Sequence, residues 1–454
     1  MSTTVNPSST AVRPPRAPAA LPLVGHGLQL VRRRLEFLQE VRAHGPVVRV
    51  RLGPTTAYLV NDHTLLHQLL VTDAARFPRG IHFQKAKSVA GNGIITASGA
   101  AHRRQRRLVL PAFNRKKVHV YGEVMREFAA ARVAAWPEGE PIELKPEFVS
   151  LATTIATKSL FATELGTAAV ATVERALPVL TRGVSLRAMD PTGLLEKLPT
   201  SANRRFAATM RELHTVIDQI IASYRGREQS GDDLLSMFMI ARDEETGEGM
   251  TDEQLRDEVI SILLSSAETT ALTMSWACHE LGRNPEVFRR LQAEVDTVTG
   301  GEPPRYEQLS ELDLTRRIVK ETLRLYPPTY FLSRSAVGDI ELGGYLIPDG
   351  STVLYSFYSQ HRDPALFRDP DRFDPDRWLP ERSADVTPAA YVAFGEGAHR
   401  CVGEAFAYAE AMTTLATIAG QRTLHPVPGR PVRPVGTVTL SPSDLKMAFR
   451  RRPR

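Results

Sequence analysis

The residue with the clearest chemistry in this 454-residue chain is Cys401, which lies in the decapeptide Phe394–Gly403, FGEGAHRCVG. Gly395 and Gly397 precede it, and glycine reaches positive φ angles at no steric cost, so this turn can fold tightly around a flat group. An alanine-rich run with helical character follows at 404–419. A cysteine just before a helix lies near unpaired N–H groups and the positive end of the dipole, and both favour the thiolate. A single Cys-x-Gly would indicate a structural cysteine, but the full pattern indicates an axial metal ligand.

Composition narrows the class of protein. The chain is 42% hydrophobic and 24% charged, with a net charge of +6. This modest excess is compatible with an acidic partner protein, whereas nucleic-acid binding would call for basic and aromatic residues interleaved in a stripe. Only Cys278 accompanies Cys401, so we expect no disulfide framework and a reducing compartment, and no His/Cys cluster has zinc spacing.

The two ends of the chain carry no sign of an anchor. Residues 1–20 are rich in Ser, Thr, Pro and Ala and lack an apolar core, so we expect a disordered segment rather than a signal peptide or membrane helix. We expect one domain over 21–450 and a basic tail at 451–454. The protein is predicted to be soluble, cytoplasmic and monomeric.

The longest predicted helix covers Thr251–Gly282. Thr251 and Gln254 form a capping-box pattern, apolar residues keep a 3.6-residue period, and Asn284-Pro285 ends the run. Its middle reads Ser265-Ser-Ala-Glu-Thr-Thr270, with Glu268 and Thr269 at its centre. An acid and hydroxyls inside an apolar helix cost stability. They are therefore either satisfied core groups or functional ones.

Weaker polar patterns lie on other predicted helices. His102 and Arg106 share a face at i and i+4, although such a basic helix is usually solvated. Glu321 and Arg324 share a face at i and i+3, and about fifty residues later comes Phe373–Trp378, FDPDRW. Strands are predicted by alternation and turn residues at 47–52, 56–60, 329–336, 340–347, 352–356 and 437–440. The glycine-punctuated stretch 77–98 is predicted to be a long functional loop.

FGEGAHRCVG resembles the haem-binding loop of the cytochrome P-450 family, whose pattern is Phe-Gly-x-Gly-x-His/Arg-x-Cys-x-Gly. The other motifs occur in the family's order, so the resemblance covers about 21–450. It implies the cytochrome P-450 fold, mainly α with a small β region, with haem b between the long helix and the cysteine helix. It also implies a monooxygenase that uses dioxygen, and it is closest to soluble bacterial members.

The resemblance assigns roles to single residues. Cys401 would be the thiolate ligand of the haem iron, and Glu268 with Thr269 would match the acid–alcohol pair that delivers protons to bound dioxygen. Ser265-Ser266 departs from the family's Ala-Gly, which puts the water network there in doubt. Haem propionates would be held by His102, Arg106, Arg334 and His399.

Two further assignments concern groups behind the haem and its thiolate ligand. Glu321, Arg324 and Arg377 would form a structural ion network rather than a catalytic one. Because no flavin or iron–sulfur segment is visible, electrons would come from NAD(P)H through a reductase and an acidic ferredoxin. A basic surface would dock that ferredoxin. That surface would be made by Arg103, Arg104, Arg107, Arg115, Lys116 and Lys117.

The substrate is expected to be a neutral lipophilic molecule. The chain is similar to actinobacterial enzymes that oxidise cyclic terpenes, so we expect a terpenoid substrate. The enzyme would act in secondary metabolism, such as antibiotic biosynthesis. A polyketide or macrolide, or a fatty acid, is the alternative, and a peroxide-using enzyme or haem-based sensor is the alternative class. The predicted pocket residues are Phe83, Val89, Ile94, Ile95, Leu264, Ser265, Tyr330, Phe331, Leu332 and Val438.

Overall fold

The computed structural model describes residues 12–161, 165–188, 195–226, 233–384, 386–429 and 431–453. The chain divides into two compact units, which are described separately. Unit 1 consists of Met1–Gln84, Thr329–Arg372 and Ser383–Cys401. Unit 2 consists of Lys85–Pro328, Phe373–Arg382 and Val402–Arg454.

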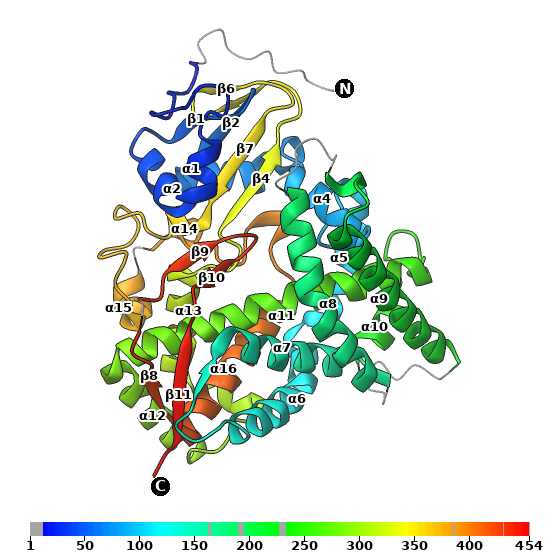
Figure 1. Ribbon diagram of the computed structural model, residues 1–454, viewed down its shortest axis with the longest axis vertical. Coiled ribbons are helices and arrows are strands. Elements are labelled where there is room, and N and C mark those ends of the chain that lie inside the picture. Colours follow the sequence, from blue (N-terminus) through cyan, green and yellow to red (C-terminus); the bar gives the residue numbers. More distant parts are fainter. Residues whose placement is uncertain are drawn as a thin grey trace. The chain divides into compact units, whose positions relative to one another are not determined.

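Unit 1 is built on a four-stranded sheet in the order β1-β2-β7-β4 (Figure 1). The hairpin of β1 and β2 turns at Gly53, whose φ of +59° suits glycine, as the sequence predicted. One face of the sheet packs on α2 through Phe37, Leu38 and Val41. The elements within unit 1 are α1 (Gly27–Arg32), α2 (Arg34–Arg42), β1 (Val47–Leu52), β2 (Thr55–Val60), α3 (His63–His67), β4 (Phe331–Ser335), β5 (Ile340–Leu342), β6 (Tyr345–Ile347), β7 (Thr352–Ser356) and α14 (Phe357–Gln360).

Residues 12–20, predicted to be part of a disordered segment, take a defined position. Residues 1–11 lie outside the described part, but Val12 forms a β-bridge with Tyr345, and the Ala17 N–H donates to the Arg49 carbonyl. These backbone hydrogen bonds anchor a segment whose composition alone suggested disorder as far as residue 20. Composition misses such docking because it registers no partner strand.

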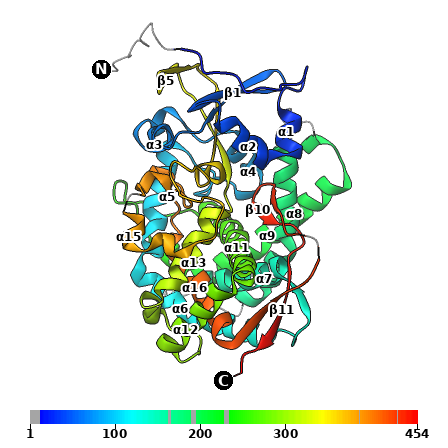
Figure 2. The same ribbon diagram turned by 90° about the vertical axis from the view of Figure 1, so that its left-hand side faces the viewer.

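Unit 2 is organised around α11 (Asp252–Arg283), the 32-residue helix predicted from the sequence. Thr251 and Gln254 form the expected capping box, and Pro285 begins the next helix directly after Asn284. Three helices pack around α11, which is seen nearly end-on in Figure 2: α7 (Leu144–Leu160), α13 (Asp313–Leu325) and α16 (Glu404–Gln421). Most of the apolar side chains of α11 are buried, which is why a helix carrying a serine pair and an acid stays continuous.

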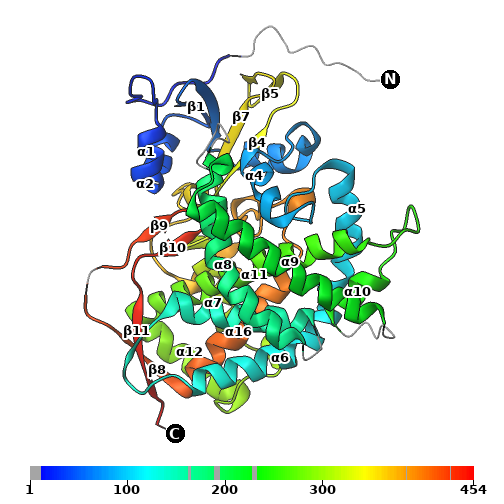
Figure 3. The same ribbon diagram turned by 45° about the vertical axis from the view of Figure 1, so that its right-hand side comes forward.

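Unit 2 contains further helices, two of which, α8 and α9, pack against each other (Figure 3). The further helices are α5 (Gly99–Val109), α6 (Arg115–Ala134), α8 (Leu165–Ala188), α9 (Ser201–Arg225), α10 (Leu234–Ile240) and α12 (Pro285–Thr299). The strands of unit 2 are β3 (Pro141–Glu143), β8 (Arg422–Pro426), β9 (Pro434–Gly436), β10 (Leu440–Pro442) and β11 (Lys446–Arg451). Among the described residues the fold is mainly helical with small sheets, as predicted.

Three short segments differ from the sequence-based expectation. The stretch 77–98 contains α4 (Ile81–Ala90) rather than only loop, because Gly80 and Gly91 flank a helix instead of interrupting a coil. At the C-terminus, Arg451 belongs to β11 and Arg452 forms an ion pair with Asp296 at 2.6 Å, so the basic tail is not simply solvated. A short helix, α15 (Pro380–Ser383), was not expected.

No helix in the described part of the chain combines the length and apolar character needed to cross a bilayer.

Candidate active site

The loop that carries Cys401 is held by backbone hydrogen bonds within unit 1. The Cys401 N–H donates to the Phe394 carbonyl at 2.9 Å, and Gly395 and Gly397 have φ angles of +72° and +67°. A side chain at Gly397 would collide with the Leu70 carbonyl, so glycine is required there. The turn therefore has the tight shape inferred from its glycines.

Cys401 and Cys278 differ in environment. Cys401 is exposed and lies three residues before α16 begins, whereas Cys278 is fully buried in α11. Burial raises the pKa of the Cys278 thiol, which therefore stays protonated. Of the two, Cys401 is the one suited to thiolate chemistry.

Three cationic or ionisable side chains of unit 1 gather at one point. Arg79 and Arg334 face each other in an antiparallel β-bridge, and Nη2 of Arg79 donates to Nδ1 of His399 at 3.0 Å. The side chain of Arg334 is buried, and Gly80 allows this approach because a side chain there would collide with Ser333. Burial, with the Arg334 charge as a second cause, lowers the pKa of Arg79 to about 9.

Like charges directly opposite each other across two strands are destabilising. An anion lying between or beside the buried Arg334 and the half-buried Arg79 would offset this repulsion. Guanidinium groups match carboxylates well through paired N–H donors. The cluster of Arg79, Arg334 and His399 thus fits the carboxylates of a haem, and Arg79 is a member that the sequence analysis missed.

Helix α5 of unit 2 carries the other predicted carboxylate-binding pair. His102 and Arg106 lie one turn apart on one face, with His102 buried and Arg106 half-buried. This burial differs from the solvated helix that a basic composition alone would suggest. The role of this pair as a haem propionate site stays a prediction.

The basic surface expected on α5 is partly neutralised. Arg107 pairs with Asp243 at 2.9 Å, and Arg104 with Glu248 at 3.7 Å, both acids lying in the turn after α10. Arg103 and Lys116 stay exposed. The predicted docking surface is therefore smaller than the sequence implied.

The centre of α11 is polar and continuous. The hydroxyls of Ser265 and Ser266 donate to the Ile262 carbonyl at 3.1 and 2.8 Å, and the Thr269 hydroxyl donates to the Ser265 carbonyl at 2.6 Å. Ser265 is exposed although most of the helix around it is buried. The Ser265 and Ser266 hydroxyls thus bond back along the helix, as expected for serines at this point.

Glu268 has a partner that the sequence did not reveal. Its carboxylate forms an ion pair with Nζ of Lys145 at 2.9 Å, and the same Nζ donates to the Ser441 hydroxyl at 3.1 Å. Lys145 comes from the first turn of α7 and Ser441 from β10, more than a hundred residues away on either side. No local spacing could have identified this pair. The acid next to Thr269 is thus held by a cation in unit 2.

The predicted pocket residues fall into different environments. Tyr330 is 1% exposed, and its hydroxyl accepts a hydrogen bond from Arg34 at 2.6 Å. Phe331 and Leu332 pack against different core clusters on opposite faces of β4. Since successive strand residues point to opposite faces, Phe331 and Leu332 cannot both line one cavity. Among the unit 2 candidates, Val89 is buried, Leu264 half-buried and Val438 exposed.

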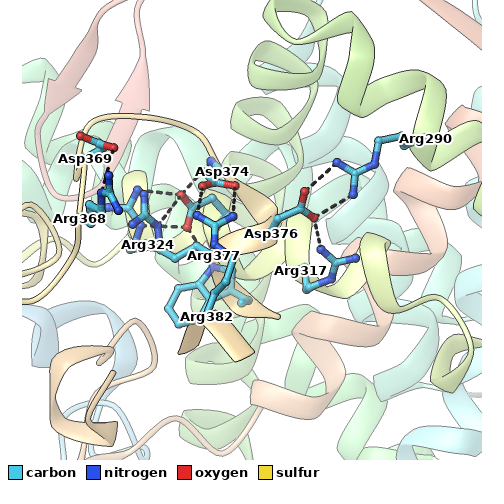
Figure 4. A network of polar contacts seen from close by, with 11 residues as sticks. Arg290, Arg317, Arg324, Arg368, Asp369, Asp374, Asp376, Arg377 and Arg382 are labelled. Carbon is cyan, nitrogen blue, oxygen red and sulfur yellow. Dashed lines mark hydrogen bonds and ion pairs between the residues drawn. The ribbon is translucent and has the colours of Figure 1, made fainter. Parts of the chain in front are cut away.

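Glu321 accepts hydrogen bonds from several groups within unit 2. Arg324 donates to both of its oxygens at 2.9 and 2.8 Å, and the Trp378 indole donates at 2.9 Å. The Asp374 N–H and Arg377 add further donors at 3.1 and 3.4 Å. Figure 4 shows Arg324, Asp374 and Arg377 within this network of polar contacts. The residues of the predicted ion network do lie together, with Glu321 and Arg324 fully buried.

Comparison with known proteins gives matches over almost the whole chain. A family model described as Cytochrome P450 matches residues 15–446. The chain is 43% identical over 449 residues to cyclooctatin synthase of Streptomyces melanosporofaciens, covering 98% of both chains. It is 39% identical over 424 residues to pentalenene oxygenase of Streptomyces avermitilis, covering 93% of this chain and 94% of the relative.

A third relative and a solved structure agree with these matches. Cyclooctat-9-en-7-ol 5-monooxygenase of Streptomyces melanosporofaciens is 37% identical over 431 residues, with 94% of each chain covered. The crystal structure of the cytochrome P450DA heme domain aligns with a TM-score of 0.88 at 26% identity, covering 98% of each chain.

Proposed function

Because this chain belongs to the cytochrome P450 family and is a monooxygenase, we propose that it hydroxylates a cyclic terpenoid. The observation that carries the substrate class is the 43% identity, over 98% of both chains, to a protein named cyclooctatin synthase. Two further relatives have names that refer to terpenoids, and each aligns with more than nine-tenths of the chain. We place the enzyme in the cytoplasm as a monomer that takes electrons from a ferredoxin.

Members of this family bind haem, which supplies the dioxygen chemistry when bound. In this chain Cys401 would provide the thiolate ligand, because it is the exposed cysteine in a loop fixed by Gly397. Arg79, Arg334 and His399 would hold propionate oxygens. His102 and Arg106 would hold propionate oxygens as well.

Glu268 and Thr269 would deliver protons. A hydroxyl backed by a carboxylate can pass protons into a dry site. The Thr269 hydroxyl donates to the Ser265 carbonyl, so its oxygen can still accept a hydrogen bond from a proton donor. Lys145 would hold the Glu268 carboxylate in one position between deliveries.

Replacing Thr269 by alanine is expected to uncouple the reaction. Product formed per NAD(P)H consumed should fall by roughly 100-fold or more, the low end of the range for a positioned proton donor, while NAD(P)H use continues. The ratio is measured by following NAD(P)H absorbance, product and peroxide together. As a control, Thr297→Ala removes an exposed helical hydroxyl that bonds to the Ala293 carbonyl. Full coupling in Thr269→Ala would remove Thr269 from the proton path.

Replacing Arg79 by leucine is expected to weaken haem binding. A lost charge-assisted hydrogen bond should speed haem transfer to an excess of apomyoglobin by about tenfold. Because Arg79 is held close to the Arg334 charge, the haem-free variant should be no less stable than the haem-free wild type. The matched control is Arg76→Leu, whose guanidinium is exposed and bonds to the Asp339 carbonyl. Equal haem transfer in Arg79→Leu and wild type would contradict the anion site.

The substrate class is tested by titrating the purified ferric protein while watching the Soret band. Cyclooctat-9-en-7-ol and pentalenene are expected to give a low-spin to high-spin shift, since a bound apolar molecule displaces water from the iron. A macrolide and a fatty acid serve as comparison ligands. A shift with either of those, and none with the terpenoids, would overturn the terpenoid proposal while leaving the family unchanged.

A further inference from the structure

Two consecutive acids on α11 hold the turn that follows α4. The carboxylate of Asp257 accepts a hydrogen bond from the Asn92 N–H at 2.8 Å, and that of Glu258 accepts one from the Ile94 N–H at 2.9 Å. All four residues belong to unit 2. Neighbouring helical residues diverge by about 100°, so the two carboxylates grip the turn from two directions. We call this pair of contacts the carboxylate clamp.

The turn is shaped to fit the clamp. Gly91 has a φ of +50°, and a side chain there would collide with the Asp257 carboxylate. A side chain at Gly93 would collide with the Ser261 hydroxyl. The Thr96 hydroxyl donates to the Gly91 carbonyl at 2.7 Å, which closes the turn on itself. The backbone thus comes as close to α11 as glycine permits.

The Gln105 side chain of α5 adds a further support, donating to the Asn92 carbonyl. Asn92 is therefore held through both its N–H and its carbonyl, by α11 and α5 respectively. Because the N–H and the carbonyl of Asn92 are both hydrogen-bonded, the segment between α4 and α5 has little freedom to shift.

The clamp places an acidic side chain in the core. Glu258 is fully buried, and burial together with the nearby Asp257 raises its pKa to about 8. Burial also raises the pKa of Asp257, which faces Arg256 and Glu253 on its own helix and His214 from α9. A glutamine could accept the same backbone hydrogen bond at lower cost. Such an unfavourable arrangement is typical of positions where function constrains the backbone.

We propose that Asp257 and Glu258 are positioning residues that fix Ile94 and Ile95 as one wall of the substrate pocket, and so determine which carbon is oxidised. The inference rests on the proposed function, in which these isoleucines contact the terpenoid. The Ile94 N–H is bound directly by Glu258, and Ile95 follows it with a half-buried side chain. A shift of about 1 Å in such a wall changes reactivity strongly, because orientation decides which C–H bond is attacked.

The clamp is tested first by hydrogen exchange of the haem-loaded protein. In Glu258→Ala the peptide spanning 91–97 should exchange about tenfold faster, since a buried acceptor for a backbone N–H is lost. Glu258→Gln should exchange like the wild type, because its amide oxygen still accepts. Glu253→Gln removes an exposed acid from the first turn of the same helix and should also match the wild type. Unchanged exchange in Glu258→Ala, or fast exchange in Glu258→Gln, would overturn the clamp.

The effect on specificity is tested with pentalenene and cyclooctat-9-en-7-ol as probes. Glu258→Ala should change the ratio of oxidised positions at least threefold, whereas Glu258→Gln should restore the wild-type ratio. Faster exchange with an unchanged product ratio would overturn the specificity role. If the wild-type enzyme oxidised neither probe, the terpenoid proposal would fail, whereas the clamp would still be decided by hydrogen exchange.

Discussion

Replacing Cys401 by serine is expected to abolish turnover and to remove the red-shifted Soret band that thiolate ligation gives to the carbon monoxide complex. Serine keeps the size of the side chain, but its hydroxyl is not ionised near neutral pH and cannot supply an anionic sulfur ligand. Even loss of a hydrogen-bond partner behind a metal ligand costs roughly 10–100-fold. Loss of the ligand itself should therefore lower the rate by at least two orders of magnitude.

The loop around Cys401 should survive this change. Its tight shape comes from the Cys401 N–H bond to the Phe394 carbonyl and from Gly395 and Gly397, none of which involves the sulfur. The far-ultraviolet circular dichroism should therefore match the wild type. Cys278→Ala is the matched control, because it removes the other cysteine from the buried face of α11. A thiolate-type spectrum in Cys401→Ser, or its loss in Cys278→Ala, would contradict the assignment of Cys401.

The sequence predicts α11 and the strands of unit 1 well because their signals are local. The strand predicted at 437–440 is wrong, because residues 437–439 form a bend between β9 and β10. Thr251 and Gln254 satisfy each other's backbone groups, and their side chains lie within four residues of the helix start. The turn at Gly53 likewise depends on the residues of the turn itself, and it aligns β1 with β2. The cysteine loop belongs to the same class, because positive φ at Gly395 and Gly397 determines its shape.

The parts of the site that the sequence did not predict depend on contacts across long separations. Arg79 becomes notable only when β4 brings Arg334 opposite it. Lys145 becomes the partner of Glu268 only when α7 packs along α11. The clamp on the turn after α4 also depends on distant contacts. In the sequence, Asp257 and Glu258 look like the acidic residues that are common in the N-terminal half of a helix.

Lys145 changes how Glu268 can act. An acid held by a cation 2.9 Å away has a fixed position, and it must release that contact to reach another donor or acceptor. The Ser441 hydroxyl can retain Lys145 while the carboxylate moves, because it binds the same ammonium group. In the proposed proton path, the Glu268 carboxylate would leave Lys145 to deliver a proton and return to it afterwards.

Replacing Glu321 by glutamine is expected to give the largest loss of stability in the chain. The side chain keeps its volume, but Arg324, fully buried beside it, would lose the negative partner that bonds it through two oxygens. Removing one member of a buried ion pair costs roughly 3–5 kcal/mol, because the remaining charge is left in a poorly polarisable interior. The Trp378 indole and the Asp374 N–H would also compete for a single amide oxygen. The free energy of unfolding in urea measures the loss.

A neighbouring carboxylate in Figure 4 provides the control. Asp376 also binds two arginines, Arg290 at 2.8 Å and Arg317, and the hydrogen bond from Arg290 is the first cause lowering its pKa to about 2. Its side chain and that of Arg290 are partly exposed, so solvent replaces much of what a lost partner would remove. Asp376→Asn should therefore cost about 1 kcal/mol or less. Equal losses in Glu321→Gln and Asp376→Asn would show that burial of Arg324 does not determine the cost, and the structural role assigned to Glu321 would be wrong.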